Sequence, residues 1–138
     1  MFGGAFGKNL DLITRELDAL VLRQNVIANN IANADTPNFK RSTVDFETEL
    51  SKALASEEQP PSFQQVITDP RDIPFSTPVD YKSVAPRTVL DYLSTAQNNG
   101  NNVDMEQEAM DSLNTQLLYT ALSQSISGAF QRVNIVLK

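Results

Sequence analysis

The sequence has no cysteine and no histidine. Thiol catalysis, imidazole acid–base catalysis and zinc sites of the usual ligand type are therefore excluded. The carboxylates show no spacing that would fix a catalytic pair, and residues 104–108 lack the alternating ligands and central glycine of a calcium loop. The N-terminal glycines form no phosphate-binding motif. We expect no enzymatic activity, no cofactor and no bound metal ion.

Positive charge is also scarce, with 11 Lys and Arg against 17 Asp and Glu and a net charge of −6. Phosphate contacts require clustered lysine and arginine, so nucleic acid and anionic membranes are disfavoured as partners. The one adjacent basic pair, Lys40-Arg41, fits a solvated turn. No basic segment followed by an apolar run opens the chain, so we expect no secretory signal peptide. If the protein leaves the cytoplasm, it uses another route.

Charge is missing altogether from residues 24–34. Asn25, Asn29 and Asn33 recur every four residues, which places three amides on one face of a helix. Asparagine is a mediocre helix former, and an exposed helical face normally carries Lys and Glu. The pattern indicates side chains that bond to protein instead of water. A solvated polar face that happens to lack charge is the alternative.

The same region belongs to a long predicted helix over residues 9–34, roughly 40 Å long at 1.5 Å per residue. Its apolar residues follow alternating steps of three and four, with one polar position at Gln24. Thr36-Pro37 would stop the helix, because a residue before proline is pushed out of the α region. The predicted seam consists of Leu10, Ile13, Leu17, Leu20, Gln24, Ile27, Ile31 and Ala34.

A second long helix is predicted to begin at Asp104, which can cap it, with Gln107 completing a capping-box-like pair. Its apolar stripe starts at Met110, Leu113 and Leu117 and continues almost to the last residue. Residues 112–131 are twenty residues without a charge, yet too rich in Ser, Thr, Gln and Asn for lipid. A water-facing helix would carry charges opposite its stripe. We therefore expect protein on most sides of it; a surface helix of unusual composition is the alternative.

Residues 38–102 show no clear hydrophobic period. A short amphipathic helix is predicted over residues 45–55 and a short strand over residues 63–68. The prolines at positions 70, 74, 78 and 86 forbid a long helix beyond it. The expected organisation is an N-terminal assembly helix (1–37), an irregular extended middle segment (38–102) and a C-terminal assembly helix (103–138), forming one structural unit.

This pattern predicts a mainly α fold in which the terminal helices pair as an antiparallel coiled-coil hairpin. One hairpin buries one stripe per helix, so the other uncharged faces imply packing of many copies. Unlike patches meeting head to tail give open helical polymers. The predicted subunit interface comprises Asn25, Ile27, Asn29, Asn30, Ile31, Asn33, Asp35, Thr36 and Pro37, together with Leu118, Leu122, Ile126, Phe130, Val133 and Leu137.

The segment ANNIANADTPNFKR, residues 28–41, resembles the N-terminal signature of bacterial flagellar rod, hook and hook-associated axial proteins. The preceding LRQNVI and the brevity of the chain fit the same family. The following STVDFETEL and the C-terminal helix narrow the resemblance to its short proximal rod proteins. The resemblance covers roughly residues 10–50 and 100–138.

The resemblance implies a structural subunit of the flagellar basal body rod, the shaft that transmits torque for motility. Such proteins are similar in being exported by the flagellar type III apparatus and polymerising in the periplasm. Expected partners are other copies, other rod proteins, and the membrane-ring or export-gate adaptor at the rod base, with no direct membrane insertion. Phe46 and Leu50 resemble a short export-gate motif; ordinary packing is the alternative for both.

Two rival functions remain open on the sequence. One is a different short proximal rod protein of the same family. The other is a stand-alone helical-hairpin adaptor or chaperone, which would stay a discrete oligomer where a rod subunit forms filaments.

Overall fold

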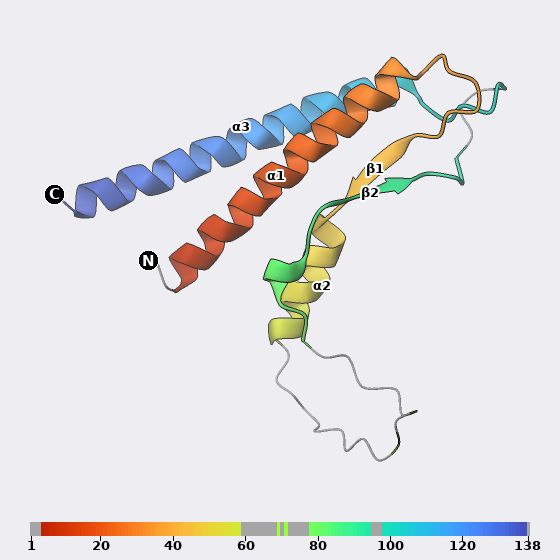
Figure 1. Ribbon diagram of the computed structural model, residues 1–138. Helices are drawn as coiled ribbons and strands as arrows, with labels where there is room; N and C mark the ends of the chain where they lie inside the picture. Colours follow the sequence, from red (N-terminus) through yellow and green to blue (C-terminus); the bar gives the residue numbers. More distant parts are fainter. Residues whose placement is uncertain (1–3, 59–68, 70, 72–77, 95–97, 138) are drawn as a thin grey trace. The chain divides into compact units, whose positions relative to one another are not determined.

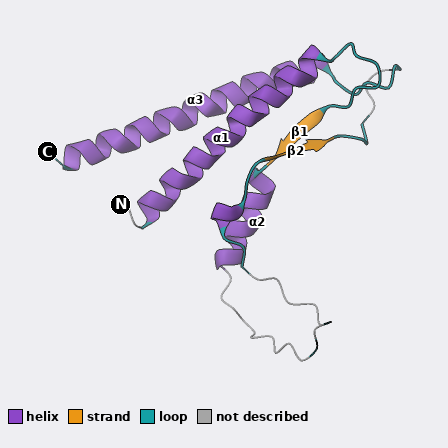
Figure 2. Ribbon diagram, viewed as in Figure 1, coloured by secondary structure: helices purple, strands orange, loops and turns teal. Residues whose placement is uncertain are grey.

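The computed structural model describes residues 4–58, 69, 71, 78–94 and 98–137. The chain is mainly helical, with a small sheet in which two short strands pair (Figure 2). The prediction of a mainly α chain with a long helix near each end is confirmed. In chain order the elements are α1 (Ala5–Ala32), β1 (Ser42–Asp45), α2 (Glu47–Glu58), the 3-10 helix η1 (Tyr81–Ser83), β2 (Arg87–Leu90) and α3 (Met105–Val136).

The first helix, α1, ends slightly before the predicted proline stop. The side chain of Asn33 ends it, because its Nδ2 donates to the Asn29 carbonyl at 2.8 Å while its backbone N–H donates to the same carbonyl and to that of Asn30. Asparagine side chains compete in this way for the carbonyls of a last helical turn. The helix therefore stops at Ala32, and Ala34 already lies in the turn that follows.

The last helix, α3, begins where the sequence predicted. Asp104 caps it, since its Oδ1 accepts from the backbone N–H groups of Glu106 at 2.9 Å and Gln107 at 3.3 Å. The predicted capping box is wrong in its second half. The Gln107 amide does not return to the cap but donates to Asp111 Oδ1, one turn further on, at 2.9 Å. An acceptor four residues away on the same face competes successfully for it.

The middle of the chain is more regular than expected. The predicted helix 45–55 starts later and runs further, as α2, because Asp45 is the last residue of β1 and the carbonyl of Phe46 accepts the first helical bond, from Leu50 N at 2.9 Å. Strand β2 overlaps residues 88–93, for which the sequence predicts a short element but not its type. The predicted strand 63–68 lies outside the described residues.

The chain divides into two compact units. One contains α2 and η1, within Asp45–Arg87. Two hydrogen bonds join these elements: Val79 N donates to Ser56 Oγ at 3.0 Å, and Tyr81 N donates to Glu57 Oε1 at 3.1 Å. Tyr81 itself is buried.

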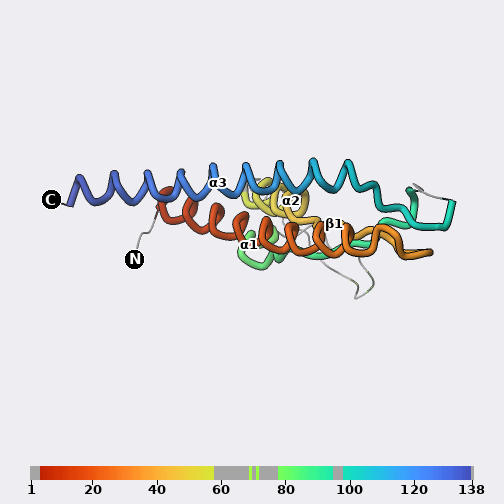
Figure 3. Tube along the Cα trace, turned by 90° about the horizontal axis from the view of Figure 1, so that it is seen from above, coloured from red at the N-terminus to blue at the C-terminus, as the bar shows by residue number. Residues whose placement is uncertain are grey.

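The other unit contains α1 and α3, within Met1–Val44 and Thr88–Lys138. The two helices lie side by side in both views (Figures 1 and 3). They are closest where α1 ends and α3 begins, and they diverge toward the chain termini (Figure 1). We call the close end the junction end and the other the open end. Gln24 of the predicted seam contacts α3, donating to Ser112 Oγ at 3.0 Å.

Burial follows this divergence. The fully buried residues of α1 are Ala19, Leu20, Val26, Ile27 and Asn30, all in its second half. Seam residues nearer its start, such as Leu10 and Leu17, are only half-buried. In α3 the buried positions are Glu108 and Thr115, both near its beginning. The core of this unit therefore sits at the junction end.

Candidate functional site

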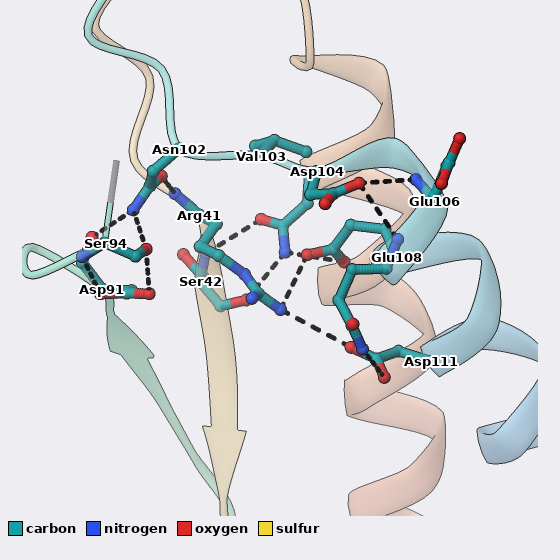
Figure 4. Close-up of polar contacts among 12 residues, drawn as sticks. Arg41, Ser42, Asp91, Ser94, Asn102, Val103, Asp104, Glu106, Glu108 and Asp111 are labelled. Atoms are coloured by element: carbon teal, nitrogen blue, oxygen red, sulfur yellow. Dashed lines mark hydrogen bonds and ion pairs between the residues drawn. The ribbon is translucent and has the colours of Figure 1, made fainter. Parts of the chain in front are cut away.

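A cluster of polar side chains holds the junction end together, where α1, β1 and the start of α3 meet (Figure 4). Asn30, on the last turn but one of α1, is 1% exposed. Its Nδ2 donates to the carbonyl of Ser42 at 2.8 Å and to Glu108 Oε2 at 3.1 Å. Its Oδ1 accepts from Ser42 N at 3.0 Å. One side chain thus joins three elements that are distant in sequence.

Glu108 is the charged member of this cluster and is 1% exposed. Its Oε1 lies 3.0 Å from the guanidinium of Arg41, which also lies 3.6 Å from Asp111. A buried carboxylate is tolerated only when it is paired and hydrogen-bonded. We call Asn30, Arg41 and Glu108 the junction triad.

Sequence reasoning missed the triad. It took Lys40-Arg41 for a solvated turn and gave Glu108 no role beyond a favourable charge near the start of the helix. The structure instead buries Glu108 and directs Arg41 at it, so the solvated reading of Arg41 is wrong. Lys40 likewise contacts protein, donating to the Gly100 carbonyl at 2.8 Å. The available signals were an acid in the first turn of α3, Glu108, and an arginine directly before β1, Arg41.

Two further asparagines secure the turn after α1. Asn101 is fully buried, and its Nδ2 donates to the carbonyls of Asn33, Ala34 and Thr36 at 2.8–2.9 Å. Terminal helix carbonyls need such partners when they are withdrawn from water. Asn102 accepts from Arg41 N at 2.6 Å and donates to the carbonyl of Asp91 at 2.7 Å. Asn102 thereby joins the chain segment before β1 to the segment after β2.

Asp91 ends this network at the surface. Its carboxylate accepts from the hydroxyl of Ser94 at 2.6 Å and from the backbone N–H groups of Ser94 and Leu93. These bonds, the serine hydroxyl first, favour the ionised form and hold the pKa of Asp91 below its ordinary value of 3.8.

The predicted interface residues divide by exposure. Ile27 and Asn30 are buried within the chain itself, so the unit occupies them already. The half-buried ones are Ile31, Asn33, Leu122, Ile126 and Val133. The exposed ones are Asn25, Asn29, Asp35, Thr36, Pro37, Leu118, Phe130 and Leu137.

Exposed apolar side chains gather on α3. Met110, Leu113 and Leu117 are 61%, 62% and 69% exposed, and their spacing places them on one helical face. The apolar stripe in the sequence predicted that these three residues face the partner helix. This prediction is wrong, because the three side chains are exposed and do not pack on α1. Glu108 and Thr115 take those positions. A second apolar group, Ile135, Val136 and Leu137, is at least 75% exposed at the end of the helix.

Two grooves lie between the helices of this unit. One, of about 310 Å³, is lined by α1, β1 and α3 and includes Arg23, Val44 and Leu118. The other, of about 330 Å³, lies between Val21 and Asn25 of α1 and Tyr119 of α3. The first is lined in part by the charged side chains of Arg41, Glu108 and Asp111, whereas the second lies along the uncharged part of α3. Neighbouring side chains can pack in the two grooves. Among the described positions there is no cluster of metal-ligating residues.

The candidate export motif lies in the other unit. Phe46 is fully buried and Leu50 is half-buried. In the folded chain Phe46 therefore has no exposed surface for a partner to contact.

No helix among the described residues has the length and apolar content needed to cross a membrane.

Comparison with known proteins now bears on these features. Residues 17–40 match the family model described as flagella basal body rod protein. The chain is 41% identical over 133 residues to the flagellar basal body rod protein FlgB of Borreliella burgdorferi, covering 96% of this chain and 98% of the relative. It is 32% identical to FlgB of Bacillus subtilis over 96% and 95% of the two chains. FlgB of Escherichia coli is 36% identical over 77% and 78%.

The matched segment 17–40 contains most of α1, the turn after it and Lys40, so it coincides with the signature noted in the sequence and includes Asn30 of the triad. The relatives extend the similarity over nearly the whole chain. The similarity distinguishes between the short proximal rod proteins that the sequence left open, because the relatives described above are all FlgB. The chain belongs to the FlgB family of flagellar basal body rod proteins, structural subunits of the bacterial flagellum.

Proposed function

We propose that this chain builds the proximal rod by polymerising through its terminal helices, which pair as an antiparallel coiled-coil hairpin. The carrying observation is the exposed apolar surface of α3 within a segment that has no charge. Leu113 and Leu117 are each more than 60% exposed. Burying such a side chain stabilises an assembly by about 1.5–3 kcal/mol, and a monomer has nothing to bury it against.

The hairpin pairing is supported by the order of contacts along the helices. Gln24 bonds to Ser112, whereas Asn30, later in α1, bonds to Glu108, earlier in α3. Contacts that rise along one helix and fall along the other belong to oppositely directed helices. Residues 1–37 and 103–138 would then act as the assembly helices and residues 38–102 as the middle segment.

The uncharged amide face of α1 is proposed as a second contact surface. Asn25 and Asn29 are exposed on it, and neither has a charged neighbour within residues 24–34. In a packed interface amides bond to backbone and side chains of the neighbour, whereas a charge would be stranded. Unlike surfaces on α1 and α3 favour head-to-tail contacts with copies and with other rod proteins.

Folding and assembly are proposed to be coupled. The open-end halves of both helices contribute few buried side chains, and isolated helices are marginal in water. In the free chain these halves would be partly unfolded until neighbours cover them. Polymerisation would thereby wait for export.

The proposed route is the flagellar type III apparatus, with assembly in the periplasm on an adaptor at the rod base. Phe46 and Leu50 would be read there by the export gate. Because folding buries Phe46 completely, the gate would read it only in an unfolded chain. This agrees with export before assembly.

The test places a charge on each proposed surface. Asn29→Lys on α1 and Phe130→Lys on α3 should leave secretion intact and abolish rod assembly, read as loss of swimming and of rods in isolated basal bodies. Asn33→Lys should act like Asn29→Lys, with some loss of helix termination as well. Ser51→Lys, exposed on α2 and outside the candidate export motif, is the matched control and should swim. Normal motility in Asn29→Lys and Phe130→Lys would reject both surfaces.

A measurement of particle size distinguishes the rod subunit from the alternative, an adaptor or chaperone. A rod subunit should form filaments or aggregates as its concentration rises, measured by light scattering. A discrete oligomer at all concentrations would favour the adaptor.

A further inference from the structure

We propose that the junction triad of Asn30, Arg41 and Glu108 determines the register of α1 against α3. The inference concerns one chain and does not depend on the assembly proposed above. Some contact within the helix pair must prevent α3 from sliding or rotating along α1.

Apolar packing alone does not prevent it. The large apolar residues of α3 are spread around the helix, and Met110, Leu113 and Leu117 face away from α1. The buried positions of α3 at the junction end are Glu108 and Thr115, both polar, while Leu118 remains 42% exposed. A helix with apolar residues on several faces gains similar burial in several registers. Hydrophobic burial therefore leaves the register of α3 weakly specified.

The triad specifies one register. Only in this register does Glu108 have both partners, a hydrogen bond from Asn30 Nδ2 to its Oε2 at 3.1 Å and an ion pair between its Oε1 and Arg41 at 3.0 Å. A slip of seven residues keeps the same helical face inward but moves Glu108 about 10 Å along the axis, at 1.5 Å per residue. Asn30 and Arg41 would then lose their common acceptor, and a buried unpaired charge or amide is strongly disfavoured. A single buried polar group is known to fix register in coiled coils by this means.

The triad also positions the first strand. Asn30 exchanges two hydrogen bonds with the backbone of Ser42, and Arg41 precedes it directly. The register of the helices and the start of β1 are thus set by the same three side chains. Loss of the triad should therefore alter the register of the helices and the position of the start of β1 together.

The absence of cysteine makes the register measurable by cross-linking. Gln24→Cys with Ser112→Cys reports the native register, because these side chains touch at 3.0 Å. Gln24→Cys with Met105→Cys, and Gln24→Cys with Tyr119→Cys, report slips of seven residues in either direction. A short thiol-specific cross-linker is applied to the full-length chain at low concentration, in buffer where circular dichroism shows both helices formed.

The decisive variant is Arg41→Met combined with Glu108→Leu, which replaces the buried ion pair by apolar side chains and leaves no buried charge unpaired. Asp111 loses its 3.6 Å contact with Arg41, but its side chain is 35% exposed and keeps the hydrogen bond from Gln107. Such replacements preserve or raise stability while removing the specification. We expect the helical signal to persist and the ratio of native to slipped cross-links to fall by about ten-fold. Glu108→Gln, which can still accept from Asn30, should fall between this variant and the unaltered triad.

Lys52→Met with Glu49→Leu is the matched control, because it removes an exposed ion pair within α2 in the same way. It should leave every cross-link unchanged. The proposal is overturned if the Arg41→Met, Glu108→Leu chain cross-links only at the native pair with undiminished yield. It is also overturned if the α2 control lowers the native-to-slipped ratio as much.

Discussion

Asn30 and Ser42 are joined by two hydrogen bonds in opposite directions, side chain to carbonyl at 2.8 Å and backbone N–H to side chain at 3.0 Å. The amide of Asn30 thus pairs with the backbone of Ser42 as a neighbouring strand would. It ties the last turns of α1 to the first residue of β1, while its second N–H bond reaches Glu108.

Asn30→Ala should therefore be costly. It leaves the Ser42 backbone groups and one Glu108 oxygen without their partner, which costs at least about 2 kcal/mol of unfolding free energy. Urea unfolding of the purified chain, followed by circular dichroism, measures it. Asn29→Ala, one residue away and exposed, should change the unfolding free energy by less than about 0.5 kcal/mol. Equal effects of the two substitutions would contradict the role given to the buried amide.

Two glycines should respond oppositely to alanine. Gly100 has φ +80°, and an added Cβ would lie 2.6 Å from Asn38 Oδ1, so Gly100→Ala should lower the midpoint of thermal unfolding. Gly128 lies within α3 with nothing near its Cβ position, so Gly128→Ala should raise helix stability by about 0.5–1 kcal/mol. Thermal melts of both variants give the signs. A stabilising Gly100→Ala would show that the turn adopts another conformation in solution.

Hydrogen exchange should reveal a gradient in the free chain. Buried residues cluster in 19–30 of α1 and 108–115 of α3, so amides there should be protected. Amides of residues 120–136 and 5–12 should exchange faster and become protected only after assembly. Mass-spectrometric exchange on free chains and on isolated rods measures the difference. Uniform protection along both helices of the free chain would argue against coupled folding and assembly.

The network at Asp91 should depend on pH in one direction. Because its pKa is lowered below 3.8 by the Ser94 bonds, the stabilisation is fully present above pH 3.8 and is lost as the pH falls through the lower folded value. Ser94→Ala should raise the pKa of Asp91 toward 3.8, measured by NMR titration of its carboxyl carbon. Ser83→Ala is the control, because the Ser83 hydroxyl bonds to the backbone carbonyl of Asp80 and not to a carboxylate. An unmoved Asp91 titration in Ser94→Ala would refute the assigned cause.

The two interpretations of Phe46 separate in a secretion assay. Phe46→Ala creates a cavity and should destabilise the unit of α2 and η1 by about 3–5 kcal/mol whether or not the export gate reads it. If the gate reads Phe46, secretion of the unfolded chain should also fall. Tyr81→Ala truncates another buried aromatic of the same unit and should lower stability without lowering secretion. Secretion of Phe46→Ala at the unaltered rate would leave Phe46 a packing residue alone.

The elements themselves were largely predictable because their signals are local. Asp104 caps α3 through its own side chain and the next backbone N–H groups, all within four residues. The apolar steps of α1 and the charge-free run in α3 are likewise properties of neighbouring positions, and they sufficed to predict two long helices near the ends of the chain. Residues 28–41 sufficed for the family.

Only the tertiary structure decided which side chains those helices share. Asn30, Arg41 and Glu108 are up to 78 residues apart, and no periodicity in the sequence distinguishes Glu108, buried, from Glu106, exposed on the same first turn. The partner of a buried charge is set by chain topology, which brings β1 beside the two helices. The sequence determined two long helices, each with a stretch free of charge, and the fold determined that three distant polar residues, Asn30, Arg41 and Glu108, meet between them.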